Sequence, residues 1–539
     1  MIKRIPGIGS HSYYAIFAGT ASNTGSTSTA QALRVTGIFP TATTVSSAGS
    51  AGNYTLTGTV ISRGSLGVAP TGSVSIADTT NGNFVLGSTV LGTPSSVQSF
   101  APQVTYSAGS QVAPYVATGD FNGDGIPDLV VGDGSGSTTV SVFLGNGDGT
   151  FQPAVTYGTQ SQPFGIAVGD FNGDGIPDLA VVNMTSYSIS ILLGKGDGTF
   201  LTQSHFTTGA GTQPNSITTA DFNNDGILDL AVTNDLTGTV GIFLGKGNGT
   251  FNPAVTYAVG TDPHSVTPFN ANGVVNLAVA NSGLGTVSVL LGNGDGTFKS
   301  QVTYPAGNSP YTVLAADVNN DGIPDLEVTN SGGSTVGVLI GKGDGTFKPQ
   351  VTYATGGSPD RFAASDVNRD GNVDLIVANF ASDTVSVLLG NGDGTFQPQI
   401  TYPVGNSPYS VAIADFNGDG FPDLAVANRV DANVSVLLNE VIQTATIPPV
   451  SVPGTGTHQV DASYPGDSNF SGSTSSTIPV TASPQTTSLV LTARQSNVSI
   501  LLTATLNPST IGNLTTTNET VTFQNGSTAL GTGTLNSLG

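Results

Sequence analysis

Aspartate and asparagine recur at fixed spacing in a short segment that could bind a metal ion. The stretch DFNGDGIPDL begins at Asp120 and is repeated letter for letter from Asp170. Variants of it begin at Asp221, Asp317, Asp366 and Asp415. Written as nine positions, the segment reads Asp, x, Asn, x, Asp, Gly, x, x, Asp. If the chain curls tightly around the Gly at position 6, the side-chain oxygens at positions 1, 3, 5 and 9 converge, and the backbone carbonyl at position 7 can join them.

The donor atoms of these six acidic loops select among metal ions. They are hard oxygens without nitrogen or sulfur, which favours Ca²⁺ over Zn²⁺. Mg²⁺ is disfavoured because it requires stricter geometry and retains its water ligands. The three carboxylates of each loop repel one another, so we expect one Ca²⁺ in each of the six loops. The alternative is an Asx turn without metal, but an acid at position 9 in all six copies favours the metal.

The expected ligands are the residues at positions 1, 3, 5, 7 and 9 of the six loops. They are Asp120, Asn122, Asp124, Ile126, Asp128; Asp170, Asn172, Asp174, Ile176, Asp178; Asp221, Asn223, Asp225, Ile227, Asp229; Asp317, Asn319, Asp321, Ile323, Asp325; Asp366, Asn368, Asp370, Asn372, Asp374; and Asp415, Asn417, Asp419, Phe421, Asp423.

The spacing of the loops reveals a further unit without acids. Successive loops begin 50, 51, 96, 49 and 49 residues apart, and 96 is two periods of 48. A unit is therefore expected near residue 269, where the sequence reads TPFNANGVVNLAVAN. Here Asn270, Asn272 and Asn276 stand where the other units have Asn, Asp and Asp. Because every carboxylate is gone, we expect no metal in this fourth unit.

The repeat also predicts the elements that position the loops. Seven units of about 49 residues have the length of a four-stranded β-propeller blade. In the second unit we expect strands at 164–170, 178–183, 188–194 and roughly 200–208. A second motif, LGNGDGTF or a near copy, recurs with the same period from Leu144 onward, and a hairpin turn explains it better than a second metal site. The fold class is therefore all-β.

The ends of the repeat indicate how the ring closes. The seventh unit stops at VSVLLNEV, residues 434–441, and has no fourth strand. An orphan segment at 99–106 matches the fourth strands of other units, and we expect it to complete the seventh sheet. Such closure removes exposed strand edges and brings residues near 98 and 440 together.

The flanking sequences predict further β domains. We expect a propeller at 97–440, inserted into an immunoglobulin-like sandwich formed by 39–96 and 441–482. Residues 1–38 and 483–539 are expected to be parts of neighbouring immunoglobulin-like domains. The alternative is one propeller between two poorly ordered tails.

Composition restricts the partners. Charged residues make up only 9% of the 539-residue chain, yet its net charge is −22. Nucleic acid and anionic membranes are therefore not expected partners. The absence of Cys removes disulfides and thiolate chemistry. No apolar run approaches membrane-spanning length, and the first residues do not resemble a signal peptide. We expect the chain to begin inside a larger protein.

These loops resemble the FG-GAP repeats of integrin α-subunits and the VCBS-type variant of large bacterial surface proteins, over about residues 97 to 440. The resemblance implies Ca²⁺ in the loop between strands 1 and 2 of each blade, on one face of the propeller, at the ligands given above. Position 3 is Asn throughout, one charge fewer than an all-Asp loop, which disfavours very tight binding. The flanks resemble bacterial immunoglobulin-like repeats, with YPGDSNFSGSTS from Tyr464 as the marker.

The face opposite the loops is the expected place for a ligand. Most units place a residue after Pro at the start of the first strand, and seven such residues should ring the channel mouth: Tyr115, Phe164, Asn215, His264, Tyr311, Asp360 and Tyr409. The loops between strands 2 and 3 add Tyr187, Phe380 and Arg429. Aromatic and polar groups together suit sugar or peptide docking, whereas the alternative is that they plug the channel.

The sequence thus predicts a secreted or cell-surface calcium-binding protein that adheres to an extracellular protein or glycan. A structural spacer that binds only calcium is one alternative. A polysaccharide-active enzyme is another, although the four His residues form no pattern typical of a catalytic triad. We expect no enzyme activity, and the sequence leaves the oligomeric state open.

Overall fold

The computed structural model describes residues 9–13, 16–20, 23–27, 31–35, 38–62, 69–92, 98–109, 115–271, 273–483, 488–496, 499–507, 510–511, 514–515, 520–525 and 527–534. These residues confirm the all-β prediction, because their helical elements are two short 3₁₀ turns, η1 (Asp235–Thr237) and η2 (Ser331–Gly333). The chain divides into two compact units. The first contains Phe100–Asn439, and the second combines Ile8–Ser99 with Glu440–Gly539.

The first unit consists of four-stranded antiparallel sheets that follow one another along the chain. The strands of the first three sheets are β11 (Tyr115–Gly119), β12 (Asp128–Gly132), β13 (Thr139–Phe143) and β14 (Val155–Gly158); β15 (Pro163–Gly169), β16 (Asp178–Asn183), β17 (Ser188–Leu192) and β18 (Ser204–Thr207); and β19 (Pro214–Ala220), β20 (Asp229–Asn234), β21 (Thr239–Phe243) and β22 (Val255–Ala258). The strands expected in the second unit are present, and the outermost one is shorter than expected.

Three further sheets repeat this order. Their strands are β23 (Pro263–Ala271), β24 (Val274–Asn281), β25 (Thr286–Leu290) and β26 (Val302–Pro305); β27 (Pro310–Ala316), β28 (Asp325–Asn330), β29 (Thr335–Leu339) and β30 (Val351–Ala354); and β31 (Pro359–Ser365), β32 (Asp374–Asn379), β33 (Thr384–Leu388) and β34 (Ile400–Pro403).

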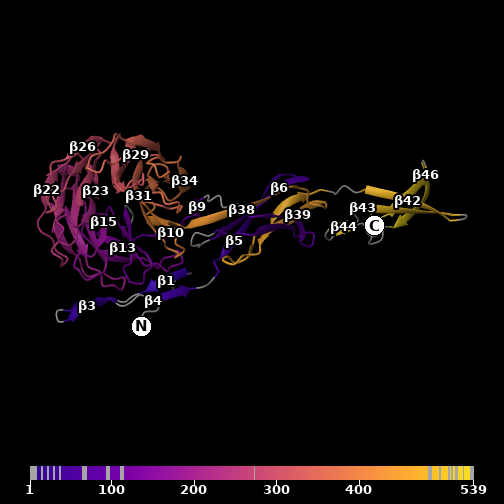
Figure 1. The fold of residues 1–539 in the computed structure, drawn as a ribbon, viewed down its shortest axis with the longest axis horizontal. Helices are drawn as coiled ribbons and strands as arrows, with labels where there is room; N and C mark the ends of the chain where they lie inside the picture. Colours follow the sequence, from indigo (N-terminus) through magenta and orange to yellow (C-terminus); the bar gives the residue numbers. More distant parts are fainter. Residues whose placement is uncertain are drawn as a thin grey trace. The chain divides into compact units, whose positions relative to one another are not determined.

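The seventh sheet joins the two ends of this unit. Its strands lie side by side in the order β10 (Val104–Ser107), β37 (Asn433–Leu437), β36 (Asp423–Asn428) and β35 (Pro408–Ala414). The strand β10 lies within the orphan segment 99–106, which was expected to complete the seventh sheet. Its Val104 pairs with Val436 of β37. The first strand of each sheet contacts the first strand of the next, and β35 contacts β11, so the sheets form a closed ring (Figure 1). We call the centre of the ring, which the seven first strands surround, the central channel.

Apolar side chains fill the space between neighbouring sheets. Between the first and second sheets, for example, Val130, Val142, Leu179 and Val181 are at most 1% exposed. Both faces of the middle strands are therefore buried, which explains their continuous Val, Leu and Ala runs. At about 25 cal/mol per Å² of buried apolar surface, these inter-sheet layers supply the main stabilisation of the ring.

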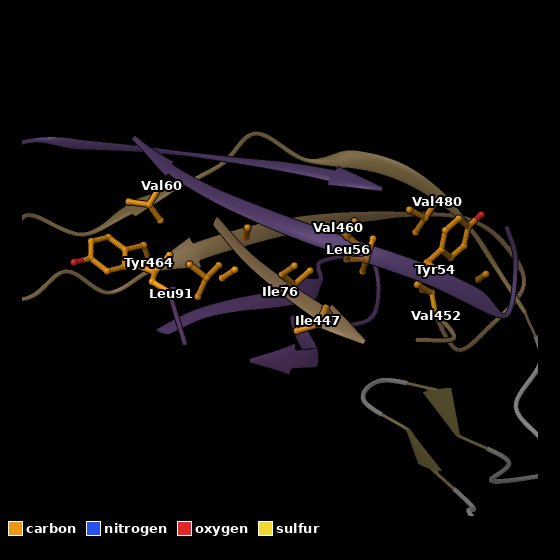
Figure 2. Close-up of a cluster of buried hydrophobic side chains, with 14 of the residues drawn as sticks. Tyr54, Leu56, Val60, Ile76, Leu91, Ile447, Val452, Val460, Tyr464 and Val480 are labelled. Atoms are coloured by element: carbon orange, nitrogen blue, oxygen red, sulfur yellow. The ribbon is translucent and has the colours of Figure 1, made fainter. Parts of the chain in front are cut away.

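The second unit is built from two segments of the chain, one that precedes the ring in the sequence and one that follows it. One sheet orders β5 (Thr41–Ser50), β6 (Asn53–Ser62), β38 (Asn439–Val450) and β9 (Gln98–Phe100). The other orders β40 (Ser473–Thr474), β39 (Gly456–Tyr464), β7 (Ser73–Asp78) and β8 (Phe84–Val90), with β41 (Ile478–Ala482) paired to β39. Figure 2 shows Leu56 and Ile76 from the earlier segment in one apolar core with Ile447 and Val460 from the later one.

The terminal segments form only two-stranded sheets among the described residues. In the N-terminal segment β1 (Gly9–Tyr13) pairs with β4 (Gln31–Val35), and β2 (Ile16–Thr20) pairs with β3 (Asn23–Thr27). In the C-terminal segment the pairs are β42 (Ser488–Ser496) with β43 (Ser499–Asn507), β44 (Thr510–Ile511) with β45 (Leu514–Thr515), and β46 (Thr520–Asn525) with β47 (Thr528–Thr534).

Candidate calcium loops and the aromatic channel end

Each acidic loop connects the first two strands of its sheet and is held by its own side chains. In the first loop the backbone N–H of Asp124 donates to Asp120 Oδ1 at 3.0 Å and to Asn122 Oδ1 at 2.9 Å. The Gly125 N–H donates to Asp120 Oδ2 at 2.7 Å, and Gly125 has a φ of 78°, which favours glycine. Because one N–H group binds both oxygens, positions 1 and 3 converge on the same point.

The other five loops repeat this arrangement. In each of them the Asn side chain at position 3 also donates to the carboxylate at position 5, at 2.8 to 3.0 Å. The oxygens of positions 1, 3 and 5 therefore cluster in every acidic loop that the structure describes.

The aspartate at position 9 has a different role from the one expected. Asp128 Oδ2 accepts from the Phe121 N–H at 2.9 Å, and Oδ1 accepts from the Gly145 N–H at 2.8 Å. This carboxylate ties the loop to the end of β13, and the same pair of bonds recurs in the other five sheets that carry an acidic loop. An acid at position 9 thus has a structural cause of its own, so its presence in all six copies does not distinguish a metal loop from an Asx turn.

Burial raises the pKa of these position-9 carboxyl groups. The pKa of Asp128 rises to about 6, chiefly through desolvation; two backbone N–H donors lower it, and the charges of Asp124 and Asp120 raise it further. Asp178, Asp229, Asp325 and Asp374 behave alike, with pKa values of about 6. Burial raises the pKa of Asp423 to about 8. Each loop therefore concentrates negative charge, and of the six loops only the one at 366–374 contains a basic residue, Arg369.

The residues present fit Ca²⁺ through positions 1, 3 and 5. Their donors are oxygens only, they converge, and lone pairs remain after the N–H bonds have been counted. The position-9 carboxylate is oriented toward the backbone, and the three carboxylates of one loop do not all offer oxygens within 4.8 Å of one another. Positions 1, 3 and 5, with the position-7 carbonyl, are thus the residues that would hold the ion.

The fourth sheet lacks the loop altogether. β23 and β24 extend toward each other until Ala271 pairs with Val274, and Asn272 lies outside the described residues. Asn276, at position 9, accepts from the Gly292 N–H at 3.0 Å and donates to the Val274 carbonyl at 3.0 Å. The amide thus replaces the clamp of Asp128 without a charge.

The seven residues expected at the channel mouth do meet at one end of the channel, which we call the aromatic end. Four of them, Phe164, Asn215, Asp360 and Tyr409, are at most 6% exposed and close this end. The hydroxyl groups of Tyr311 and Tyr409 share a hydrogen bond of 2.5 Å. The Tyr311 ring stacks on the His264 ring, with centroids 4.3 Å apart. The buried four thus form a plug, while Tyr115, His264 and Tyr311 remain half-exposed.

A polar network that the sequence analysis missed crosses the aromatic end. The Arg361 side chain, from β31, donates through Nη2 to Asn215 Oδ1 of β19 at 3.1 Å. Its guanidinium also lies 4.9 Å from the Tyr115 ring centre and 5.8 Å from that of Tyr409. Arg361 is one residue beyond the position chosen from the sequence, and only its long reach across the channel brings it into the site.

Asn215 links this arginine to acidic groups. Its Nδ2 donates to Asp235 Oδ2 at 2.9 Å and lies 3.1 Å from His264 Nδ1, while His264 Nε2 lies 3.4 Å from Asp262. Burial raises the pKa of Asp235 to about 7 and lowers that of His264, and the Arg361 charge further lowers the His264 pKa. Asp235, Asp262 and His264 could converge on a cation, but the neighbouring guanidinium charge opposes one.

The loops between strands 2 and 3 surround this end with accessible side chains. Tyr187, Phe380 and Arg429 are half-exposed, and the Arg429 guanidinium lies 5.5 Å from the Tyr409 ring centre. The same loops expose Leu236, Leu284 and Val430 by 66%, 59% and 62%, residues that the sequence analysis did not single out. Their signal in the sequence was an apolar residue within a short polar turn.

No helix among the described residues has the length and apolar character needed to cross a membrane.

The ring of repeated four-stranded sheets and the acidic loops define a repeat protein in which every unit except the fourth shares one loop chemistry. A family model described as FG-GAP-like repeat matches residues 120–181, 171–232, 221–269, 269–328 and 366–426, about half of the chain. The chain belongs to this family.

Comparison with other proteins adds structural likeness at low identity. A functionally unknown protein from Desulfotomaculum acetoxidans is 14% identical with a TM-score of 0.42, and the match covers 67% of this chain and 99% of that one. A periplasmic gluconolactonase from Pseudomonas aeruginosa is 17% identical with a TM-score of 0.46, and the match covers 62% of this chain and 97% of that one. No curated protein matches the sequence.

Proposed function

We propose that this chain is an extracellular recognition or adhesion protein whose seven-bladed β-propeller is made rigid by calcium and presents a docking surface for a protein or glycan. The observation that carries the proposal is the division of labour between the two ends of the ring. One end gathers convergent oxygens in six loops, and the other exposes apolar and aromatic side chains around a closed plug.

Calcium would act here as a structural ion. Asp120, Asn122 and Asp124, with their counterparts, would hold it, and the bound ion would neutralise carboxylates that otherwise repel one another. Six such ions would fix the connections between the first and second strands of six sheets. The chain's own side chains already curl each loop, so binding would require little rearrangement.

The second unit would be an immunoglobulin-like sandwich interrupted by the propeller. In support of this, its two sheets each combine strands from before and after the ring. Asp78 Oδ2 and His458 Nδ1, from opposite sides of the insertion in sequence, lie 2.6 Å apart in its interior. Modules of this kind are common in extracellular proteins, which is consistent with secretion or display on the cell surface.

At the aromatic end of the ring, the side chains support recognition of a ligand better than catalysis. His264 has Asn215 and Asp262 as its recorded polar partners, and neither is a hydroxyl nucleophile. By contrast, Leu236, Leu284 and Val430 expose apolar surface at the end of the ring that also carries the aromatic side chains, a composition suited to a binding surface.

Calcium binding is tested by substituting Asp124→Ala and Asp174→Ala and measuring thermal unfolding with and without calcium. Both variants should lose part of the calcium-dependent stabilisation. Asn270→Ala, at position 3 of the acid-free fourth unit, is the control and should lose none. Equal stabilisation in all three variants would exclude these loops as ligands.

Recognition is tested on a glycan array and on immobilised extracellular matrix proteins, with the full chain in calcium. Leu236→Ser with Leu284→Ser should abolish binding to any ligand found. Val255→Ser, which changes another exposed apolar side chain on the outer strand β22, should leave binding intact. A chain that binds nothing in any condition would instead be a structural spacer.

A further inference from the structure

The central channel contains a polar cavity below the plug. Its volume is about 150 Å³, whereas about 10–15 Å³ suffices for one water molecule. Hydroxyl groups of Ser216, Ser265, Thr312 and Ser410 line it, together with Arg361. The cavity can therefore accommodate a molecule with several non-hydrogen atoms.

The cavity wall is rich in hydrogen-bond donors. Ser216 Oγ accepts from the Val266 N–H at 3.4 Å, and Ser265 Oγ accepts from the Val313 N–H at 3.4 Å. Ser410 Oγ likewise accepts from the Val116 N–H at 3.3 Å. Since these oxygens are engaged as acceptors by the neighbouring strand, their hydroxyl protons are available to a ligand in the channel.

Two buried groups at this cavity lack a partner. Arg361 is 5% exposed and its Nε–H has no hydrogen-bond acceptor, and Thr312 is 4% exposed with an unpartnered hydroxyl. A buried donor without an acceptor is costly, and a buried charge is more so. Among the residues described, no carboxylate lies within the 4.0 Å ion-pairing distance of this guanidinium. Burial raises the pKa of Asp235 and of Asp360, two acids whose charges interact with this guanidinium, which reduces the compensation they provide.

We propose that this cavity binds a small monocarboxylate, with one carboxylate oxygen on Arg361 Nε–H and the other within reach of the channel hydroxyls. One lining side chain carries a permanent positive charge, so a singly charged anion is matched, whereas sulfate or phosphate would leave charge uncompensated. A free organic acid and an acidic sugar share this chemistry. The inference is independent of the recognition role proposed above.

The shape of the channel indicates the route of entry. The first residues of β19, β31 and β35 are buried at the plug, whereas their last three residues are half-exposed. The opening therefore lies at the end that carries the acidic loops. The ligand would enter there and stop beneath Arg361.

Calorimetric titration of the full chain in excess calcium tests the site with acetate, D-glucuronate, D-glucose and sulfate at constant ionic strength. Acetate or glucuronate should bind, glucose should not, and sulfate should bind more weakly than acetate. Acetate alone would identify a site for free acids, and a higher affinity for glucuronate would identify one for acidic sugars.

Variants place the bound anion at the inferred site. Arg361→Gln should weaken binding by about tenfold to a hundredfold, the range for a hydrogen bond to a charged group. Thr312→Val, a nearly isosteric change, should weaken it about twofold to tenfold and keeps the proposal testable if Arg361→Gln does not fold. Lys348→Gln, which changes an exposed charged residue outside the cavity lining, should bind as the wild type. Absence of carboxylate binding, tighter binding of sulfate, or unchanged affinity in Thr312→Val would overturn the proposal.

Discussion

In the third sheet β19 and β20 end after seven and six residues and leave an acidic loop between them, whereas in the fourth sheet β23 and β24 continue for nine and eight residues into a tight hairpin. The sequences differ mainly in their acids. The third unit has Asp221, Asp225 and Asp229 at positions 1, 5 and 9. The fourth unit has no acid at these positions and carries Asn276 at position 9. The surrounding strands and their register are otherwise alike.

The difference shows what the carboxylates replace. In the hairpin the backbone groups bond to one another along the ladder, but in the acidic loop the Asp225 and Gly226 N–H groups bond to the Asp221 carboxylate instead. Position 9 serves the sheet in both cases, as an acid or as an amide. Any ion-binding chemistry would therefore lie in positions 1, 3 and 5, where the fourth unit has lost both carboxylates and keeps only the Asn at position 3.

Removing calcium should have the largest effect. At a free concentration one hundred times the dissociation constant, each occupied site contributes about 2.7 kcal/mol of stability. Scanning calorimetry with calcium and then with EDTA should therefore show a large fall in the unfolding temperature of the ring. Titration should give about six ions per chain, one for each acidic loop and none for the fourth unit. A stoichiometry of seven ions, or of none, would contradict the assignment of calcium to the acidic loops and not to the fourth unit.

The pH dependence of the calcium-free protein should be next in size. The folded-state pKa of Asp128 is about 6 and that of Asp423 about 8, against an ordinary value of about 3.9. The folded state thus binds protons more tightly than the unfolded chain, so stability is greatest near pH 4 and falls as the pH rises through 6 to 8. Calcium should stabilise least at pH 4 and most above pH 8.

Denaturant unfolding at several pH values, with EDTA and with calcium, measures this dependence. Asp423→Asn should reduce the slope between pH 6 and pH 8, because the folded-state pKa of this residue is about 8; Asp235, with a pKa of about 7, also contributes to this slope and should retain its part of it. Calcium-free stability that rises over pH 4 to 8 would contradict the assignment.

A reciprocal exchange at position 9 should have a smaller effect. Asp178→Asn keeps an oxygen for the Gly194 N–H but turns an amide N–H₂ toward the Phe171 N–H, which is a donor. Asn276→Asp places a carboxylate against the Val274 carbonyl. Each change leaves one buried group unsatisfied and should cost about 1–3 kcal/mol in urea unfolding. Asn276→Asp should not raise the calcium stoichiometry, and a seventh ion in that variant would show that position 9 alone makes a site.

The repeat made much of the fold predictable. The period of the loops, the orphan segment at 99–106 and the acid-free fourth unit all followed from spacing and residue type, because each unit is constrained by the same inter-sheet packing. The convergence of Asp120 and Asn122 also followed, because it depends on contacts within a few residues.

What escaped prediction depends on contacts distant in sequence. The clamp from Asp128 to the Gly145 N–H spans 17 residues and requires the register of β12 with β13. Arg361 reaches Asn215, 146 residues away, across the channel. The sequence left open whether the residues after Pro form a docking site at the channel mouth or plug it. Phe164 and Tyr409 fill it, and this could not be predicted because side-chain volume at the centre of a ring follows only from all the sheets together.

The smallest effect is expected in the GDGTF turns, where the chain again supplies its own control. Asp197 Oδ1 accepts from the Thr199 N–H at 3.0 Å and from its hydroxyl at 2.5 Å. In the third sheet Asn248 Oδ1 makes the same two bonds with Thr250, at 3.1 and 2.6 Å. Because an amide oxygen suffices, Asp197→Asn should change neither the calcium stoichiometry nor the unfolding temperature. The loss of one ion in this variant would mean that the turns, and not the acidic loops alone, bind calcium.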